Sequence, residues 1–142
     1  MNVDDFELPS GKLSEGAQRV IDRALEDVHR REHALLTNTH VLFALAQSEW
    51  DLFAGTLRGA GVNPLDVTRA MDEHLRRHVP CAGTGRPRVA PETKLVCRLA
   101  LHQAARVGHS TVRTADLLHA LFAETAGMRM SILRQHGAEP RT

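Results

Sequence analysis

The sequence predicts an all-α protein in which two copies of one helical unit pack as one domain of about seven to eight helices. Aromatic residues form only 4% of the chain and Tyr is absent, although β-strands favour aromatic and β-branched residues. The abundant residues include Ala, Leu and Arg, which are strong helix formers. Residues Leu13–Pro64 also align without a gap with Val89–Pro140, at the offset that takes His33 to His109. Such an alignment indicates that one structural unit occurs twice.

Identities between the two copies concentrate on apolar positions and at the end of the unit. They include Val20 with Val96, Ala24 with Ala100, Leu45 with Leu121, and Gly61 with Gly137. The repeat divides the chain into a flexible leader (1–12), a first repeat (13–78), a linker rich in Gly and Pro (79–88) and a second repeat (89–140). We therefore expect the two units to pack about an approximate twofold axis.

The first copy is expected to begin with two helices. Ser14 is a suitable N-cap for a helix that ends near Arg31, and apolar residues recur along it at steps of three and four. Thr37 or Asn38 can cap the second helix. Because this second helix is apolar on most sides, we expect it at the centre of the core.

Two further helices complete the first copy. The third is expected over about Trp50–Ala60, and Gly61 can adopt the left-handed conformation that ends it. Pro64 suits the first turn of the fourth helix, where its missing N–H leaves no hydrogen bond unmade.

The second copy repeats this order up to its third helix. A helix is expected from Pro91 to about Val107, and another, capped by Thr114, through about Ala123. The third is expected over about Met128–His136. No counterpart of the fourth helix follows Pro140, so the second copy is predicted to be shorter.

The charge balance excludes a generally polycationic or polyanionic protein. Eighteen Lys and Arg residues oppose 17 Asp and Glu residues, giving a formal net charge of +1. The most basic stretch, Arg76–Arg88, lacks the interleaved aromatic residues of single-strand nucleic-acid sites, so we expect a solvated surface and no nucleic-acid partner. The sequence has neither a signal peptide nor an apolar run of ~20 residues, which predicts a cytoplasmic protein without a membrane partner.

One motif suggests an alternative enzymatic function. His29, Glu32 and His33 match the H-x-x-E-H spacing of some zinc hydrolases. Against a zinc-dependent hydrolase, the first two positions are Ala105 and Gly108 in the second copy, and the helix is expected to end near this motif. We predict no catalytic residue here.

The other candidate metal and thiol sites are also incomplete. His74, His78 and Cys81 could meet within about one turn, but a structural zinc site needs a fourth ligand. Cys97 replaces Ile21 of the first copy and is expected to pack as a small apolar residue. No cofactor or metal is predicted.

The duplicated pattern resembles the N-terminal domain of Clp-type AAA+ unfoldases, the Clp N repeat domain. The likeness covers roughly Leu13–Pro140 and rests on His33 and His109, the Leu-rich helix that follows each, and the Leu–x–x–x–Gly end of each unit. The resemblance implies a pair of four-helix repeats that receives substrates or adaptor proteins for an ATP-driven ring. The chain lacks the G-x-x-x-x-G-K-[ST] nucleotide loop, so we expect a non-catalytic domain.

One branch of this family captures phosphoarginine-tagged proteins through Gly-Thr-Glu-His at the start of the second helix of each repeat. The corresponding tetrads here are Thr37-Asn38-Thr39-His40 and Arg113-Thr114-Ala115-Asp116, and both lack the Glu that would pair with the guanidinium. Phosphoarginine binding at full strength is therefore not expected. The helix N-termini and Arg113 could still attract an anion.

The resemblance implies that unfolded or tagged proteins, adaptor proteins and a Clp ATPase or protease assembly are the partners. Trp50 and Phe53 open the third helix of the first copy and have no aromatic counterpart in the second, so a partly exposed aromatic pair is a candidate peptide contact. The alternative is a free-standing accessory protein that docks on a Clp ring or sequesters a small molecule. The candidate protein-binding residues are Thr37, Asn38, Thr39, Trp50, Phe53, Arg113 and Thr114.

Overall fold

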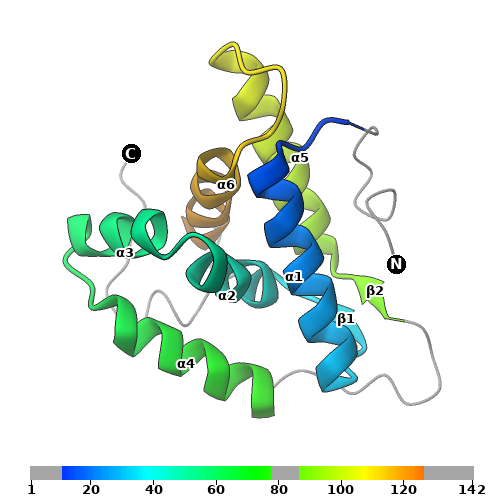
Figure 1. The fold of residues 1–142 in the computed structure, drawn as a ribbon, viewed down its shortest axis with the longest axis vertical. Coiled ribbons are helices and arrows are strands. Elements are labelled where there is room, and N and C mark those ends of the chain that lie inside the picture. The colour runs from blue at the N-terminus through cyan, green and yellow to red at the C-terminus, as the bar shows by residue number, and fades with distance from the viewer. Residues whose placement is uncertain (1–10, 78–86, 127–142) are drawn as a thin grey trace.

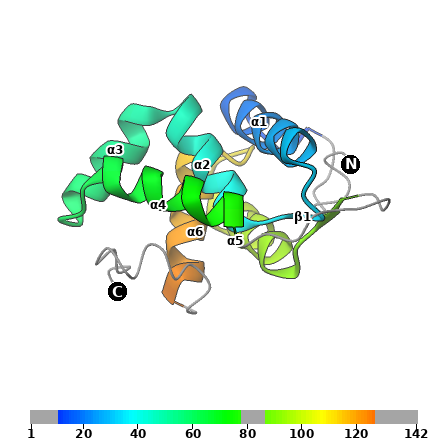
Figure 2. The same cartoon turned by 90° about the horizontal axis from the view of Figure 1, so that it is seen from below.

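The computed structural model describes residues 11–77 and 87–126 of the 142-residue chain. Helices dominate this part of the chain, as Figure 1 shows, and two short strands connect them. Figure 2 agrees with Figure 1 in placing α3 at one end of the molecule and the paired strands at the other. The elements are α1 (Glu15–Arg31), β1 (Leu35–Leu36), α2 (Asn38–Ser48), α3 (Trp50–Gly59), α4 (Pro64–Arg77), β2 (Arg88–Val89), α5 (Pro91–Arg106) and α6 (Thr114–Ala126).

Helix α2 forms the centre of the core, which confirms the prediction from its composition. Every residue from Asn38 to Ala46 is buried, and α2 contacts each of the five other helices. Because other helices surround α2, apolar residues are buried on every face of it, and its sequence needs no polar stripe. By contrast, α1 is strongly amphipathic and turns one buried stripe toward α2.

Two short strand pairings show that the copies are related by an approximate twofold axis. Leu36 of β1 pairs in parallel with Val89 of β2, and Leu13 forms an isolated parallel bridge with Val112. The repeat offset takes Leu13 to Val89 and Leu36 to Val112, so these are one contact made twice in opposite directions. The same two positions of the repeat therefore pair in both directions, as they do at an interface with twofold symmetry.

The hydrogen bonds of the two pairings repeat as well. The Ser14 N–H donates to the Val112 carbonyl at 2.9 Å, and the Ala90 N–H donates to the Leu36 carbonyl at 2.9 Å. The strand pairings were not predicted, because two-residue strands are too short to produce a periodic pattern.

The predicted signals at helix ends act as expected in the first copy. The Ser14 hydroxyl accepts from the Ala17 N–H at 3.1 Å, and Thr37 caps α2. Gly61 is left-handed with φ of 77°, and Pro64 opens α4.

The second copy departs from the prediction in two details. Thr114 is the first residue of α6 and not its cap; the N–H of the preceding Arg113 donates to the Asp116 carboxylate at 2.9 Å. The Asp116 carboxylate, at the third helical position, thus satisfies the N–H of the residue before the helix, which is one half of a capping box. The helix also continues to Ala126, beyond the predicted end at about Ala123. The predicted helix Met128–His136, most of the leader and most of the linker lie outside the described residues.

Candidate functional site

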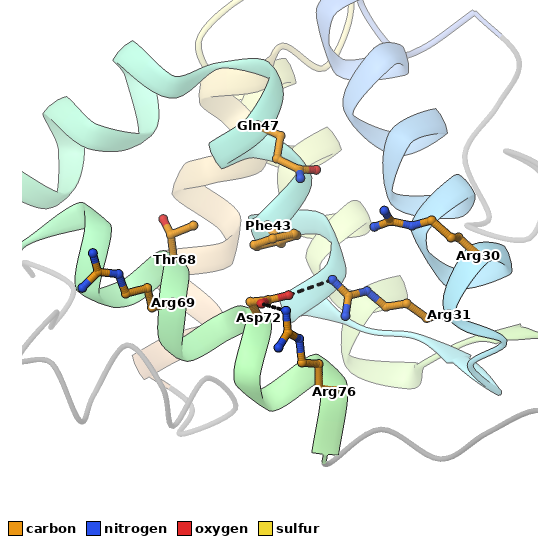
Figure 3. Close-up of a pocket in the computed structure, with 8 residues that line it drawn as sticks. All are labelled: Arg30, Arg31, Phe43, Gln47, Thr68, Arg69, Asp72 and Arg76. Carbon is orange, nitrogen blue, oxygen red and sulfur yellow. Dashed lines mark hydrogen bonds and ion pairs between the residues drawn. The ribbon is translucent and has the colours of Figure 1, made fainter.

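A cavity of about 500 Å³ lies between the last turns of α1, the outer face of α2 and the middle of α4. Figure 3 shows side chains from these three helices around it. Four of them are arginines and only one carries a negative charge. The lining residues are Arg30, Arg31, Phe43, Gln47, Thr68, Arg69, Asp72 and Arg76.

The helical repeat explains how these residues come to face one another. Arg69, Asp72 and Arg76 are separated by three and four residues, which places them on one face of α4. Phe43 and Gln47 are four residues apart on α2 and form the side opposite α4. Helices α2 and α4 pack against each other, so these two sets of side chains meet at the cavity.

Arg31 is the centre of an ion-pair network that joins α1 to α4. Its Nε lies 2.9 Å from both carboxylate oxygens of Asp27, and its Nη2 donates to Asp72 Oδ1 at 3.0 Å. Asp27 also pairs with Arg30, and Asp72 Oδ2 lies 3.0 Å from Arg76 Nη2. The Arg31 guanidinium further lies 5.8 Å from the centroid of the Phe43 ring, within the range of a cation–π contact.

The network keeps a mostly buried carboxylate ionised. Burial by itself would raise the pKa of Asp27, but hydrogen bonds and charge attraction from Arg30 and Arg31 outweigh it and lower that pKa below its usual value. Burial acts against the charge of Arg31 as well, yet Asp72 and Asp27 raise its pKa. The two groups therefore remain a charged pair at neutral pH.

A second cavity, of about 270 Å³, is lined by Arg23, Glu26, Asp27, Arg30 and Gln47. Arg30 and Gln47 line both cavities, so the two adjoin along the side of α1. Arg23 Nε donates to Gln47 Oε1 at 2.9 Å across this depression. We call the two cavities together the arginine groove.

Replacing Arg31 by Lys is expected to lower the free energy of unfolding by about 1–3 kcal/mol, because an ammonium group cannot serve both carboxylates in this planar geometry. Chemical denaturation measures the change. Arg77→Lys is the matched control: Arg77 and Glu73 form an exposed pair on α4, and that change should alter stability by less than about 0.5 kcal/mol. Equal effects of both substitutions would contradict a structural role for the Arg31 network.

The residues predicted to bind protein fall into two places. Gly16, at the start of α1, lies close to both Thr114 Cγ2 and Glu49 Oε1: a Cβ added there would sit 3.4 Å from each. The beginnings of α6 and α3, with Arg113 and Trp50, therefore flank the start of α1. Thr37, Asn38 and Thr39 lie at the opposite end of α2, about 16 Å away by helix rise.

Burial limits what several of these residues can contact. Asn38 and Thr39 are buried, Thr37 and Thr114 are partly buried, and Arg113 is exposed. Neither amide atom of Asn38 has a hydrogen-bond partner among the described residues.

Trp50 and Phe53 pack against each other with ring centroids 5.8 Å apart. Trp50 is partly buried, but Phe53 is completely buried, so the expectation that both rings are partly exposed is wrong for Phe53. The ring faces the core because α3 packs on α2 and α4. Trp50 is the accessible member of the pair.

The residues of the zinc motif do not share one helix face. Helix α1 ends at Arg31, Glu32 is the left-handed C-cap with φ of 57°, and His33 is buried. His33 Nδ1 lies 2.8 Å from His40 Nε2, whereas His29 is exposed. No group of three or more His, Cys, Asp or Glu side chains in the described part of the chain is placed to hold a metal.

Cys97 packs in the core, as predicted, with 1% of its surface exposed. Burial raises the pKa of its thiol to about 12, so the side chain is protonated at neutral pH. His78 and Cys81 of the other candidate site lie outside the described residues. Within the described residues, no helix is both long and apolar enough to cross a bilayer.

The arginine groove was not found from the sequence. The spacing of Arg69, Asp72 and Arg76 indicates a charged helix face, and Asp27 with Arg31 is a common helical ion pair. Neither pattern shows that the two faces meet, because their partners lie on different helices.

The fold and this surface define a duplicated helical domain with an open, charged groove. The chain belongs to the family of the Clp repeat (R) N-terminal domain, whose sequence model matches residues 12–136. This is the non-catalytic N-terminal domain of Clp-type ATPases.

Known proteins of this kind resemble the chain over most of its length. It is 26% identical over 127 residues to "Negative regulator of genetic competence ClpC/MecB" of Bacillus subtilis (strain 168), covering 89% of this chain but 15% of that relative. The Hsp104 N-terminal domain from Candida albicans has the same fold, with a TM-score of 0.78, 19% identity, and coverage of 90% of this chain and 83% of that one. The N-terminal domain of the ClpV1 ATPase from E. coli has a TM-score of 0.74, 22% identity, and coverage of 94% and 78%.

Proposed function

We propose that this chain is a substrate- or adaptor-recognition domain that acts with a Clp-type ATP-dependent unfoldase. The observation that carries the proposal is the family match over both repeats, in a fold whose two copies contact each other through the same elements. The chain spans about 15% of the length of the curated relative from Bacillus subtilis, and the sequence has no phosphate-binding loop. Binding of a protein, and not ATP hydrolysis, is the activity that such a domain can perform.

The surface supports this function. The arginine groove is open to solvent and offers charged donors, Trp50 is partly accessible, and Leu65 and Val107 are each more than half exposed. Such separated polar and apolar features suit weak, transient docking of extended segments, since weak interfaces are small and mixed in character.

The test is a titration of the 142-residue chain with a fluorescently labelled unfolded protein of near-zero net charge, whose cysteines are reduced and alkylated. Anisotropy is expected to rise to saturation with micromolar or weaker affinity. The same labelled protein in its native state is the control and should not bind. No binding of the unfolded form by a folded sample, as judged by circular dichroism, would contradict the proposal.

A further inference from the structure

We propose that the arginine groove binds a short acidic segment of a protein partner, three to four residues long and carrying two carboxylates. The inference rests on the proposed function and assigns one surface and one ligand chemistry to it.

The shape of the groove favours an extended peptide over a compact ligand. The two cavities adjoin at Arg30 and Gln47 and follow α1 from Arg23 to Arg31. Eight residues of helix span about 12 Å, which is the length of three to four residues of extended chain. The groove is therefore long enough for an extended segment of three to four residues.

The charges in the groove are unbalanced, and the excess is positive. The ion pairs form an alternating series, Arg30 to Asp27 to Arg31 to Asp72 to Arg76, which begins and ends with arginine. Arg69 lines the same cavity and has no acidic partner among the described residues. Four arginines against two aspartates leave two positive charges, and Arg23 with Glu26 adds one charge of each sign. A segment with two carboxylates balances the excess.

The cations at the edge of the groove are placed to accept a ligand. Only 16% of the Arg31 side chain is exposed and both of its carboxylate partners are in place, so it forms part of the wall. Arg30 and Arg76 are 69% and 66% exposed, and Arg69 is exposed as well. A guanidinium group has five N–H donors, so Arg30 and Arg76 retain donors for a second carboxylate.

The groove belongs to the first copy alone, which provides an internal control. The repeat offset takes Arg31 to Val107, Asp27 to Gln103 and Phe43 to His119, so the part of the second copy that the structure describes has no such network. Among the groove residues that have a counterpart in the second copy, Arg30 alone corresponds to the same residue type, the exposed Arg106.

The experiment measures fluorescence anisotropy of a labelled peptide in which two acidic residues are separated by two small neutral ones. A peptide with the corresponding amides, Asn and Gln, is the matched control. The full 142-residue chain is expected to bind the acidic peptide with saturation and to leave the amide peptide free. Affinity should weaken at least about tenfold when salt rises from about 50 to 300 mM, because exposed charges are screened over shorter distances.

Two variants test the location. The double variant with Arg69→Gln and Arg76→Gln is expected to bind the acidic peptide at least about tenfold more weakly than the original chain. Arg106→Gln should stay within about twofold of the original chain. Thermal unfolding of each variant, followed by circular dichroism, shows whether the fold is kept, and Arg69→Gln alone, which breaks no ion pair, serves if the double variant is unstable.

The inference is overturned if the acidic peptide does not bind, if the Arg69 and Arg76 substitutions leave its affinity unchanged, or if inorganic phosphate displaces it at equal concentration of charge. Displacement by phosphate would mean that the groove attracts any anion and does not recognise an acidic peptide. If the chain binds the unfolded neutral protein but not the acidic peptide, this inference fails while the proposed function stands.

Discussion

Replacing either Leu45 or Leu121 by Ala is expected to lower the free energy of unfolding by about 2–5 kcal/mol. The two residues occupy the same position in α2 and α6, and both are completely buried. Removing three carbons from such a site loses transfer free energy and leaves a cavity in a close-packed core. Because the sites are related by the approximate twofold axis, the two losses should be similar. Urea denaturation of each variant measures them.

Leu25 and Leu101 are the matched controls. They are also equivalent in the repeat, but each is only partly buried, so Ala at either position should cost less than at Leu45 or Leu121. A large loss at Leu45 with almost none at Leu121 would show that the equivalent sites are not packed alike, and would contradict the twofold arrangement of the core.

Stability is also expected to fall steeply as the pH drops below 6.5. His40 is completely buried beside His33. Burial, followed by the positive charge of a protonated His33, lowers the pKa of His40 to about 3. Burial and Arg31 lower the pKa of His33 too.

The sign follows from the difference between the two states. In the unfolded chain His40 takes up a proton near pH 6.5, whereas the folded chain resists it down to about pH 3, so the unfolded state binds more protons in between. Each pH unit in this window removes about 1.4 kcal/mol for each such group, or about 3 kcal/mol from His40 alone by pH 4.5. The full stability is present above pH 6.5.

The variant His40→Gln separates this effect from general acid denaturation. Gln can accept the Thr37 N–H that His40 Nδ1 now accepts at 2.9 Å, but it does not titrate. We expect lower stability at pH 7 and a shallower decline between pH 6.5 and 4.5. His102→Gln, at an exposed position of α5, should leave the decline unchanged. An equally steep decline in His40→Gln would show that other groups cause it.

At the positions that correspond to His33 and His40, the second copy pairs a histidine with a carboxylate. His109 Nδ1 lies 3.1 Å from Asp116 Oδ2, where the first copy has His33 against His40. In both copies the side chain at the third helical position accepts the N–H of the residue before its helix, and it contacts a His that lies shortly after the end of the preceding helix. The pair of contacting imidazoles is therefore a feature of the first repeat.

The helices of the first repeat could be predicted because their signals are local. Ser14, Thr37, Gly61 and Pro64 act through neighbours within four residues, and the apolar run of α2 predicted its central place. The prediction that Thr114 caps α6 is wrong because Thr is typical both of the N-cap and of the first helical turn, and a single sequence does not separate these two positions.

The candidate site was less predictable. The position of Phe53 near the start of a helix predicts a partly exposed ring, but the packing of α3 on two other helices decides that this ring faces inward. The arginine groove was missed because Arg31 and Asp72 are distant in sequence and meet only when α1 and α4 pack on α2.

The sequence alone determined that this chain is helical, that one unit occurs twice, and that it resembles the Clp repeat domain, since hydrophobic periodicity, caps and duplication are written in the order of residues. Only the tertiary structure decided which polar faces meet and which aromatic rings are buried. The physical reason is range: helix formation depends on residues a few positions apart, whereas an ion pair or a groove requires elements from distant parts of the chain to be placed within a few ångströms of one another.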